Sequence, residues 1–542
     1  MILQSDTPVG ENGRIRTLGR IAIYILQVCL LLVTAFLAYQ GVRFSFYSST
    51  VYEQPIYELR DSTFAHLLFL GAVCLGAALF YKILERLKPY QEKICTGVLI
   101  FAAVWLLTLG FLYVREHPYY PVGDQLNATA GAAYARQENF LMFDRGGYIG
   151  LYEQQKGLVF LYEILFTLFG DFSYRAVSGI HVCLSVVTLV SGYGFLKIAS
   201  KKPFYRILYC GMMMLCMPYF LYLPYAYGDL PSIAFSSVLF WALAAYGKRA
   251  KKRYIAIGAV SAALALLVRM NILIVLIAVA IGMILLAVEK GSLRPILAGL
   301  CVILAAWGSV RAVDAMYEWR SGYESGVGIP SILWVAMGLQ ETEGNPGVYN
   351  RYQQSVFEEC GFEQGPAKEI GKEYIKDRLR EMLNYPGYTK DFFVKKVKMQ
   401  WLEPLFESLY ATGTFDDEAY VPWWAGSLYY GKLHDTVWKA ANYYQSMIYL
   451  AAFAFVAGSL VKRDRRTENG TMWIPLIAVV GGFLFSMIWE NQCRYVLPYY
   501  VYLVMYAPLG IGRIAEAVSG IGTRITGKSR EEDTEESAEA AA

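Results

Sequence analysis

The chain has 542 residues, of which 56% are hydrophobic and only 17% are charged, and its mean hydropathy is +0.35. Soluble proteins carry nearer a quarter charged residues, so this composition excludes an ordinary soluble enzyme. The net charge of +4 says little until the charges are placed on the two sides of a membrane. The apolar residues gather in runs long enough to cross about 30 Å of hydrocarbon.

Twelve apolar runs follow one another along the chain, and they predict an all-α polytopic membrane protein with about twelve transmembrane helices. The first run follows Arg14, Arg16 and Arg20. It is too long for the apolar core of a cleavable signal peptide, so we interpret it as a signal anchor. The runs lie at residues 20–42, 63–84, 94–114, 176–198, 207–223, 231–247, 254–268, 271–288, 295–313, 443–461, 472–489 and 495–512.

Basic residues are concentrated in alternate loops between these runs. If each span crosses once, every basic cluster lies on the same side as the N-terminus, as the positive-inside rule requires. This pattern predicts a multi-pass protein of the cell membrane, of the bacterial plasma-membrane type, with both termini in the cytoplasm. It also requires residues 254–288 to form two spans that separate at Arg269-Met270-Asn271, because otherwise Lys290 would lie on the wrong side. The clusters are at Arg86 to Lys93, Lys197 to Arg206, Lys248 to Arg253, Lys290 to Arg294 and Lys462 to Arg466.

Two long segments, 115–175 and 314–442, are then expected on the outer side. The first ends in an apolar stretch, 157–170, which is too short to span and favours an interfacial or re-entrant helix. The second contains a charged helical pattern at 367–383, broken at Asn384-Tyr385-Pro386. Basic residues and Trp401 follow this break, as is typical of a helix lying on a membrane surface. The other predicted units are the cytoplasmic segment 1–19, the spans within 20–114, 176–313 and 443–512, and a low-complexity acidic tail, 513–542, expected to be disordered.

Asp124 is the first residue whose position suggests chemistry. It follows the third span by about ten residues and lies among tyrosines, where a carboxylate can act as a shielded general base. The alternative is a solvated loop aspartate that caps the helix beginning at Leu126. Position alone does not decide between the two.

The residues that follow Asp124 resemble the first outer loop of the GT-C glycosyltransferases, a membrane family that includes protein O-mannosyltransferases and lipid A aminoarabinose transferases. Asp124 precedes a small-residue helix, then Tyr148 and Tyr152-Glu153-Gln154-Gln155-Lys156-Gly157, then an apolar helix ending in Leu168-Phe169-Gly170. Near the other end of the chain, Arg494-Tyr495 followed by Pro498 resembles the last-span signature of the family. The stretch 384–401 resembles its long outer loop.

Two departures from the family pattern are visible. Gln125 follows Asp124 where a second acid is frequent, and the prolines expected near Tyr152 are replaced by Glu153, Gln154 and Gln155. These departures leave the substrate and the subfamily open.

The resemblance implies an inverting transfer of a sugar from a polyprenyl-phosphate donor, of the undecaprenyl or dolichyl type, to a hydroxyl of a glycan, lipid or protein on the outer face. Asp124 would take the proton of the acceptor hydroxyl. Arg494, Arg269 and Lys156 would bind the lipid phosphate, for which the guanidinium fork is well suited. The alternatives are snorkelling of the two arginines to the interface and plain loop solvation of Lys156.

Five further residues are candidates for substrate binding: Tyr152, Gln155, Asp229, Tyr495 and Glu490. Asp229 either contacts sugar hydroxyls or caps the span that follows it, and the cap is the commoner role. Glu490 either pairs with Arg494 or ends its span. The four histidines are scattered and assemble no metal site, and we expect no cofactor and no nucleic-acid partner.

Other classes of protein remain open at this stage. A surface-polysaccharide polymerase or ligase also acts on lipid-linked sugar, although such enzymes usually place their key arginines in the long loop. A lipid-linked glycan flippase or other transporter would favour internal repeats and broken helices with charges near the midplane, and no repeat is evident. A membrane scaffold would not explain why charged residues gather at the outer ends of spans.

Overall fold

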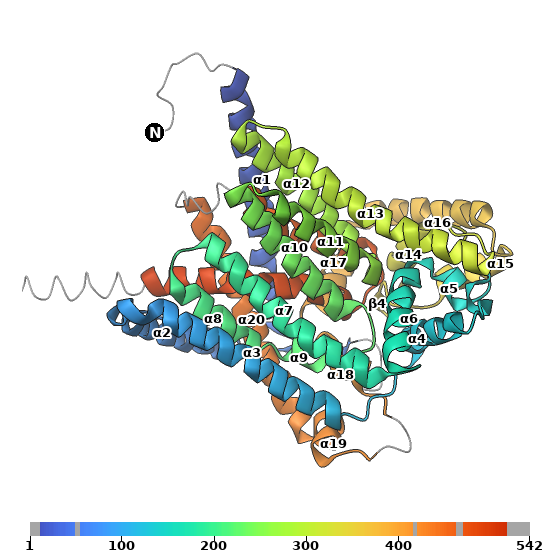
Figure 1. Ribbon diagram of the computed structural model, residues 1–542, viewed down its shortest axis with the longest axis horizontal. Coiled ribbons are helices and arrows are strands. Elements are labelled where there is room, and N and C mark those ends of the chain that lie inside the picture. The colour runs from blue at the N-terminus through green and yellow to red at the C-terminus, as the bar shows by residue number, and fades with distance from the viewer. Residues whose placement is uncertain (1–10, 49–54, 416–419, 462–469, 518–542) are drawn as a thin grey trace, which may run out of the picture.

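The computed structural model describes residues 11–48, 55–415, 420–461 and 470–517, which are almost entirely helical (Figure 1). Within these ranges the strands form only two short antiparallel hairpins, β1 (Phe44–Ser48) with β2 (Pro55–Arg60) and β3 (Glu341–Thr342) with β4 (Asn345–Pro346). Most of the predicted acidic tail, and the side chains of Arg14 and Arg16 ahead of the first span, lie outside the described residues.

Nine helices in the described part of the chain are long and apolar enough to cross a membrane. Each coincides with one of the predicted runs, although the helices extend beyond the hydrocarbon-like stretches at several ends. They lie in α1 (Glu11–Gly41), α2 (Thr63–Arg86), η1 with α3 (Lys88–Tyr90, Gln91–Glu116), α7 (Tyr174–Ala199), α10 (Asp229–Arg249), α12 (Ile272–Lys290), α13 (Arg294–Ser321), α20 (Lys432–Val461), and η5 with α21 (Gly470–Trp473, Ile474–Ile488).

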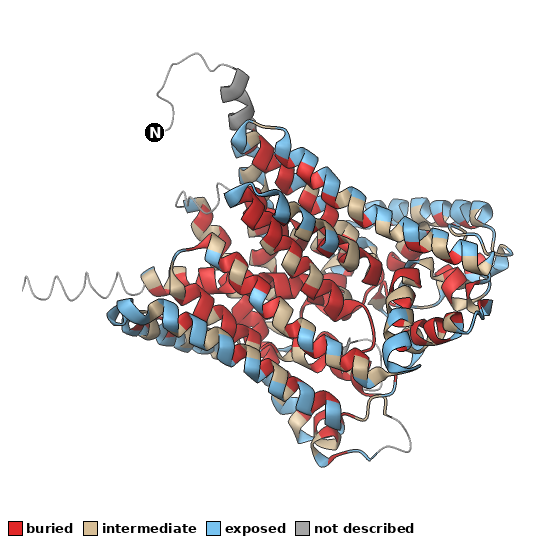
Figure 2. Ribbon diagram, viewed as in Figure 1, coloured by how far each residue is buried: buried red, intermediate tan, exposed pale blue. Residues whose placement is uncertain are grey.

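The helices at the edge of this bundle expose apolar side chains. Phe64, Leu68 and Leu75 are exposed on α2, and Ile100 and Phe101 are exposed on α3. Figure 2 shows exposed positions along the outward faces of these helices, whereas the centre of the bundle is buried. Contiguous apolar faces are rare on soluble monomers and are the surface that lipid covers. The protein is therefore a membrane-embedded helical protein.

Three predicted spans have a different form, and their crossing of the membrane stays a prediction. Residues 207–223 fall in two helices, α8 (Pro203–Met214) and α9 (Met217–Leu221), because Pro218 has no N–H to donate to the carbonyl of Met214 and its ring would clash with that carbonyl in a continuous helix. Helix α11 (Lys252–Val268) has 17 residues. Its length of about 25 Å is slightly short of the hydrocarbon thickness. It ends before Arg269 and α12 begins at Ile272, so the predicted break between two helices is confirmed.

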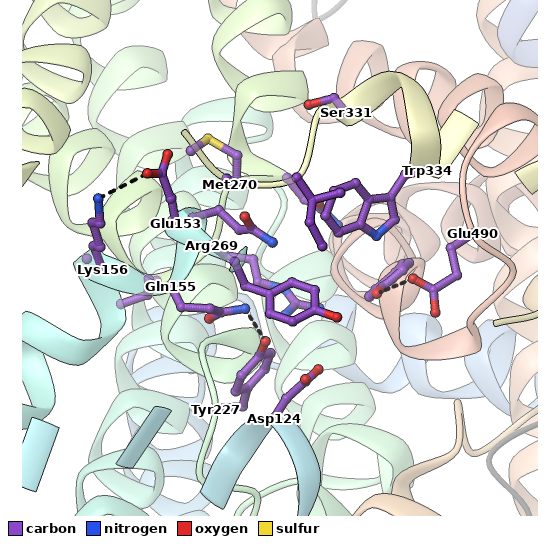
Figure 3. Close-up of a pocket in the computed structure, with 18 of the residues that line it drawn as sticks. Asp124, Glu153, Gln155, Lys156, Tyr227, Arg269, Met270, Ser331, Trp334 and Glu490 are labelled. Carbon is purple, nitrogen blue, oxygen red and sulfur yellow. Dashed lines mark hydrogen bonds and ion pairs between the residues drawn. The ribbon is translucent and has the colours of Figure 1, made fainter. Parts of the chain in front are cut away.

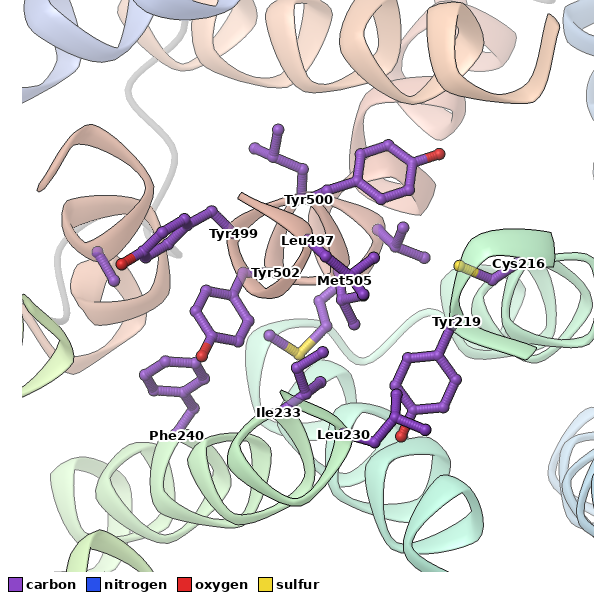
Figure 4. Packing of buried hydrophobic residues seen from close by; sticks show 14 of the residues in the cluster. Cys216, Tyr219, Leu230, Ile233, Phe240, Leu497, Tyr499, Tyr500, Tyr502 and Met505 are labelled. Atoms are coloured by element: carbon purple, nitrogen blue, oxygen red, sulfur yellow. The ribbon is translucent and has the colours of Figure 1, made fainter. Parts of the chain in front are cut away.

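The third of these spans is the helix over residues 497–517, which lies at the centre of the bundle. Its side chains from 497 to 512 are buried on every side. Figure 4 shows Tyr499, Tyr500 and Tyr502 of this helix pointing in different directions into the surrounding packing. The Tyr502 hydroxyl lies 2.7 Å from that of Ser236 in α10. Tyrosine is tolerated at this place because the helix faces protein rather than lipid, and protein supplies hydrogen-bond partners.

Most helices of the two predicted outer segments, α4 to α6 and α14 to α16, gather at one end of the molecule, at the right of Figure 1, whereas α17 lies within the bundle and α19 at the bottom of the view. Helix α6 corresponds to the predicted interfacial helix, and α16 corresponds to the charged pattern before the break at Asn384. A separate small core, with Leu333, Trp334 and Phe357 at its centre, joins α14 and α15 to Leu151. The elements outside the nine long helices are α4 (Gly123–Arg136), η2 (Leu141–Phe143), α5 (Tyr148–Leu151), η3 (Glu153–Gln155), α6 (Lys156–Phe169), α14 (Ser331–Gly338), α15 (Tyr352–Glu359), α16 (Gln364–Asn384), α17 (Pro386–Trp401), α18 (Ser408–Thr412), α19 (Trp423–Tyr430) and η6 (Cys493–Tyr495).

The prediction that the basic stretch before Trp401 lies on a membrane surface is wrong. This stretch is the second half of α17, and its residues from Lys396 to Trp401 are buried against the bundle. The Lys396 ammonium donates to the carbonyl oxygen of Gly338 at the end of α14. A cation at a helix C-terminus is stabilised by the unpaired carbonyls there. Lys396 thus joins α17 to α14. The neighbouring residues in the sequence give no sign of this contact.

The buried Lys396 leads to a prediction about stability and pH. Burial lowers the pKa of its ammonium to about 7, against a smaller opposing effect of the Glu490 carboxylate. The unfolded chain, with a lysine pKa of ~10.4, binds more protons between these values, so the folded protein gains stability as pH rises from 7 to 10. We expect a gain of roughly 1 kcal/mol per pH unit, measured by denaturant unfolding in detergent. Lys396→Met should remove this gain and Lys395→Met should keep it; an equal slope in all three proteins would contradict the assignment.

Candidate functional site

A cavity of about 980 Å³ is lined by the helices of the gathered end and by the adjoining ends of the long helices. Of the nine residues that the sequence singles out, eight line it: Asp124, Tyr152, Gln155, Lys156, Arg269, Glu490, Arg494 and Tyr495. Asp229 lines a small neighbouring cavity together with Arg269 and Tyr495. Figure 3 shows Lys156 with Glu153 on one side, Trp334 with Glu490 on the other, and Asp124 and Arg269 between them.

Asp124 projects into the cavity from the first turn of α4. Gly123 precedes it with φ +56, a conformation that favours glycine, and the Gln125 side chain accepts the backbone N–H of Val122 at 3.3 Å. The Asp124 carboxylate is therefore not needed as a cap. It accepts a hydrogen bond of 2.9 Å from the Tyr148 hydroxyl and lies 3.2 Å from a guanidinium nitrogen of Arg494.

Tyr148 holds this carboxylate as a hydrogen-bond donor. Burial, more than any neighbouring charge, raises the pKa of its phenol well above the usual value. The hydroxyl therefore keeps its proton at neutral pH. A carboxylate has about four lone-pair positions, so two protein partners leave room for a substrate hydroxyl on Asp124.

Arg494 lies in the short turn η6, directly before the central helix. Its guanidinium donates to Gln492, to the Tyr225 hydroxyl and to Asp124, and its side chain is only 10% exposed. It also lies over the rings of Tyr227 and Tyr495, with centroid distances of 5.6 and 5.4 Å. Arg494 therefore faces inward, and snorkelling to a membrane surface does not describe it.

Arg269 reaches the same two rings from the other direction. It follows the last residue of α11 in an extended conformation, and its guanidinium lies 4.9 Å from the centroid of Tyr227 and 5.3 Å from that of Tyr495. Its Nη2 lies 3.0 Å from an Asp229 carboxylate oxygen. That geometry makes an ion pair without a hydrogen bond, and the buried Nη2 has no hydrogen-bond partner among the described residues. The two arginines therefore share one site.

Of the two roles left open for Asp229, the helix cap is not seen, and contact with a sugar stays a prediction. Asp229 is the first residue of α10, and no side chain caps that helix. Its carboxylate instead turns to Arg269 and is 1% exposed. A buried carboxylate is costly unless a cation is near it, so the pair explains why an acid is tolerated here.

Two glycines allow the backbones around Arg269 to approach closely. A Cβ at Gly157, in the first turn of α6, would collide with the carbonyl oxygen of Leu267. A Cβ at Gly228 would collide with that of Val268. The end of α11 is therefore clamped between α6 and the segment that carries Tyr227, which fixes the direction in which Arg269 leaves the helix.

Lys156 lies in the cavity but is not grouped with the two arginines. Its ammonium donates to the Ser325 hydroxyl at 2.7 Å and lies 3.4 Å from the Glu153 carboxylate. Glu153 in turn accepts the backbone N–H groups of Gly326 and Val327 at 2.8 to 3.2 Å. Lys156 is thus buried as part of the junction between α6 and the segment after α13, and a role in phosphate binding stays a prediction.

The remaining predicted residues connect the two sides of the site. Gln155 donates to the Tyr227 hydroxyl, and the Tyr495 hydroxyl donates to Glu490 at 3.0 Å. Tyr152 packs against Tyr148 with ring centroids 4.9 Å apart.

Several residues that line the cavity had no role assigned from the sequence. Tyr225, which the sequence places in the same short motif as Asp229, positions Arg494 and Gln125. Trp334 and Trp489 form part of the cavity wall and lie parallel, 6.0 Å apart between centroids. The motif that contains Tyr225, Tyr227 and Asp229 could have indicated Tyr225 as a site residue. The two tryptophans are 155 positions apart in the sequence, and no local pattern could pair them.

Comparison with known proteins leaves the geometry to carry the functional argument. No protein-family model matches the chain, and no curated protein matches it. The site itself offers a carboxylate for proton transfer and two buried guanidinium groups for a negatively charged group. The residues that the structure describes contain no cluster of three or more side chains suited to hold a metal ion.

The glycine clamp can be tested by substitution. Gly157→Ala should force apart α6 and the end of α11, and overpacking of this kind costs about 1–3 kcal/mol. The matched control is Gly308→Ala in the middle of α13, where an added Cβ meets nothing within 4 Å, so that the change is neutral or gains up to ~1 kcal/mol from helix propensity. Denaturant unfolding in detergent measures both. Equal stability of the two variants would show that the clamp is absent.

Proposed function

We propose that the protein is an inverting glycosyltransferase of the GT-C type, which moves a sugar from a polyprenyl-phosphate donor to an acceptor hydroxyl on the outer face of the membrane. The observation that carries the proposal is the arrangement of Asp124, Arg494 and Arg269 around Tyr227 and Tyr495. A base and two cations in one cavity match the two needs of this transfer.

The chemistry of the transfer assigns a task to each charged group. The acceptor oxygen attacks the anomeric carbon as the bond from that carbon to the phosphate oxygen breaks, which inverts the configuration. Asp124 takes the proton of the acceptor hydroxyl. The lipid phosphate gains negative charge as it leaves, and Arg494 and Arg269 stabilise it. The contact between Arg494 and Asp124 places the base beside one of the two cations, within reach of the same anomeric carbon.

The unsatisfied groups of the site support a phosphate ligand. Among the residues that the structure describes, the buried Nη2 of Arg269 has no hydrogen-bond partner, and its ion pair with Asp229 lacks hydrogen-bond geometry. A buried donor without a partner costs roughly 1–3 kcal/mol, which an arriving phosphate oxygen would recover. Both arginines stand at ends of apolar helices, which the predicted topology places at the outer surface of the membrane.

The broken helices near Arg269 favour one other function. Helix α11 ends and α12 begins around a buried Arg269–Asp229 pair, and transporters often place binding sites at such breaks. A flippase for lipid-linked glycans is therefore the second candidate. It predicts movement of the lipid without transfer of the sugar.

The base assignment predicts the effect of Asp124→Asn. In detergent, with radiolabelled polyprenyl-phosphate sugars and a cell-envelope acceptor mixture, we expect kcat to fall by about 10²–10⁴. The variant should still fold and bind the donor, because asparagine also accepts a hydrogen bond from Tyr148. Unchanged transfer would remove Asp124 from the mechanism. Lipid movement in liposomes without transfer by the native protein would favour the flippase.

The phosphate assignment predicts a different response from Arg494→Lys. Lysine keeps the charge but cannot contact Gln492, Tyr225 and Asp124 at once, so part of the phosphate contact is lost. We expect the KM for the donor to rise roughly tenfold or more, while the affinity for the acceptor changes little. Arg311→Lys is the matched control, because Arg311 also lines the cavity but its side chain is 70% exposed. An unchanged KM for Arg494→Lys would show that donor binding depends on charge alone, and an equal rise in both variants would show that the contacts of Arg494 are not specific to the donor.

A further inference from the structure

One wall of the cavity contains a buried amide with no hydrogen bond. Gln353, in α15, is 0% exposed and lines the cavity. The hydroxyl of Tyr349 approaches its side chain, but neither the amide oxygen nor the amide nitrogen has a partner with hydrogen-bond geometry among the described residues. Leaving both ends of an amide unpaired is costly, so this side chain is placed for a polar ligand that the cavity admits.

Aromatic side chains line the same cavity as Gln353. Trp334 of α14 and Trp489 after α21 lie parallel, with an interplanar angle of 1°, and Phe485 stacks on Trp489 at a centroid distance of 5.0 Å. Tyr152 meets Trp334 edge-on and packs against Tyr148, which holds Asp124. The aromatic surface therefore leads from the gathered end of the molecule to the carboxylate, and Figure 3 shows Trp334 beside the open part of the cavity.

A saccharide has the chemistry that this wall would recognise. One face of a pyranose ring carries C–H groups that pack on an aromatic plane, and its rim carries hydroxyls that both donate to and accept from an amide. Gln353, Trp334 and Trp489 carry no charge, so the wall offers no cation to a phosphate or carboxylate. A hydrocarbon chain is disfavoured as the ligand, because it would leave the Gln353 amide without a hydrogen bond.

We propose that Gln353, Trp334 and Trp489 form the binding subsite for a neutral saccharide acceptor, whose hydroxyl is thereby presented to Asp124. The proposal rests on the proposed function and names its acceptor as a glycan. The donor sugar is attached directly to the phosphate, and the two arginines that would hold this phosphate contact Tyr227 and Tyr495 rather than Gln353, Trp334 or Trp489. The wall is therefore left for the second substrate, and proton transfer to Asp124 and loss of the lipid phosphate proceed as described above.

The test separates binding of the acceptor from folding and from binding of the donor. Gln353→Leu removes the amide and keeps an apolar side chain of similar reach, so the thermal midpoint should stay the same or rise. With polyprenyl-phosphate hexose as donor and neutral oligosaccharides as acceptors, we expect the KM for the acceptor to rise tenfold or more and the KM for the donor to stay unchanged. Gln354→Leu is the matched control, because this neighbouring side chain does not line the cavity: it bonds Glu358 at 2.7 Å and meets the Tyr152 hydroxyl only at 3.5 Å.

A second measurement tests binding of the saccharide without requiring transfer of a sugar. The purified full chain is passed over immobilised neutral di- to hexasaccharides and over serine- and threonine-containing peptides. Retention of the native protein and of Gln354→Leu on saccharides, with loss for Gln353→Leu, supports the subsite even if no transfer occurs, in which case only the proposed function fails. Retention on peptides instead, equal retention of both variants, no retention on saccharides, or a rise in the KM for the donor alone would each overturn the proposal.

Discussion

Arg269 and Arg494 bring two positive charges to the same pair of tyrosine rings inside a largely apolar protein, and the surrounding structure is arranged to tolerate this. Two like charges repel strongly where water is scarce, and each also loses its hydration. Asp229 and Asp124 each lie about 3 Å from one guanidinium, and the faces of Tyr227 and Tyr495 add a negative quadrupole between them. The arrangement is asymmetric, because each guanidinium nitrogen of Arg494 makes a hydrogen bond, whereas Nη2 of Arg269 makes none within the described parts of the chain. A ligand with negative charge would therefore find one arginine already fixed and the other still able to bond.

The groups of this site come from distant parts of the chain, and backbone packing brings them together. Asp124 begins α4, Asp229 begins α10, Arg269 follows α11 and Arg494 precedes the central helix. All four stand at helix ends, where the chain leaves the bundle. The glycines at 157 and 228 permit the close approach that this convergence requires. The long helices thus form one side of the cavity, and the short helices of the gathered end form the other.

Much of the fold follows from hydrophobic runs, because a helix in lipid must be apolar over its whole length. Runs such as 63–84 and 176–198 were therefore located to within two residues. The reasoning fails where a helix faces protein, since there tyrosine and serine replace leucine, as in the central helix. It also fails for α17, whose lysines indicate a surface although Lys396 is buried at the end of another helix. The charged site residues were found because acids and arginines are rare at span ends, whereas Trp334, Trp489 and Gln353 have no local pattern and meet only in three dimensions.

The burial of the central helix has a consequence for the order in which the molecule assembles. Residues 497–517 follow every other described helix in the chain, yet they occupy the middle of the bundle and have no side suited to lipid. During synthesis the earlier helices must therefore enter the bilayer around a space that is not yet filled. Arg494, directly before this helix, reaches Asp124 only when that space is filled. The cavity is thus completed by the last described helix to leave the ribosome, and a chain truncated before this helix would lack it.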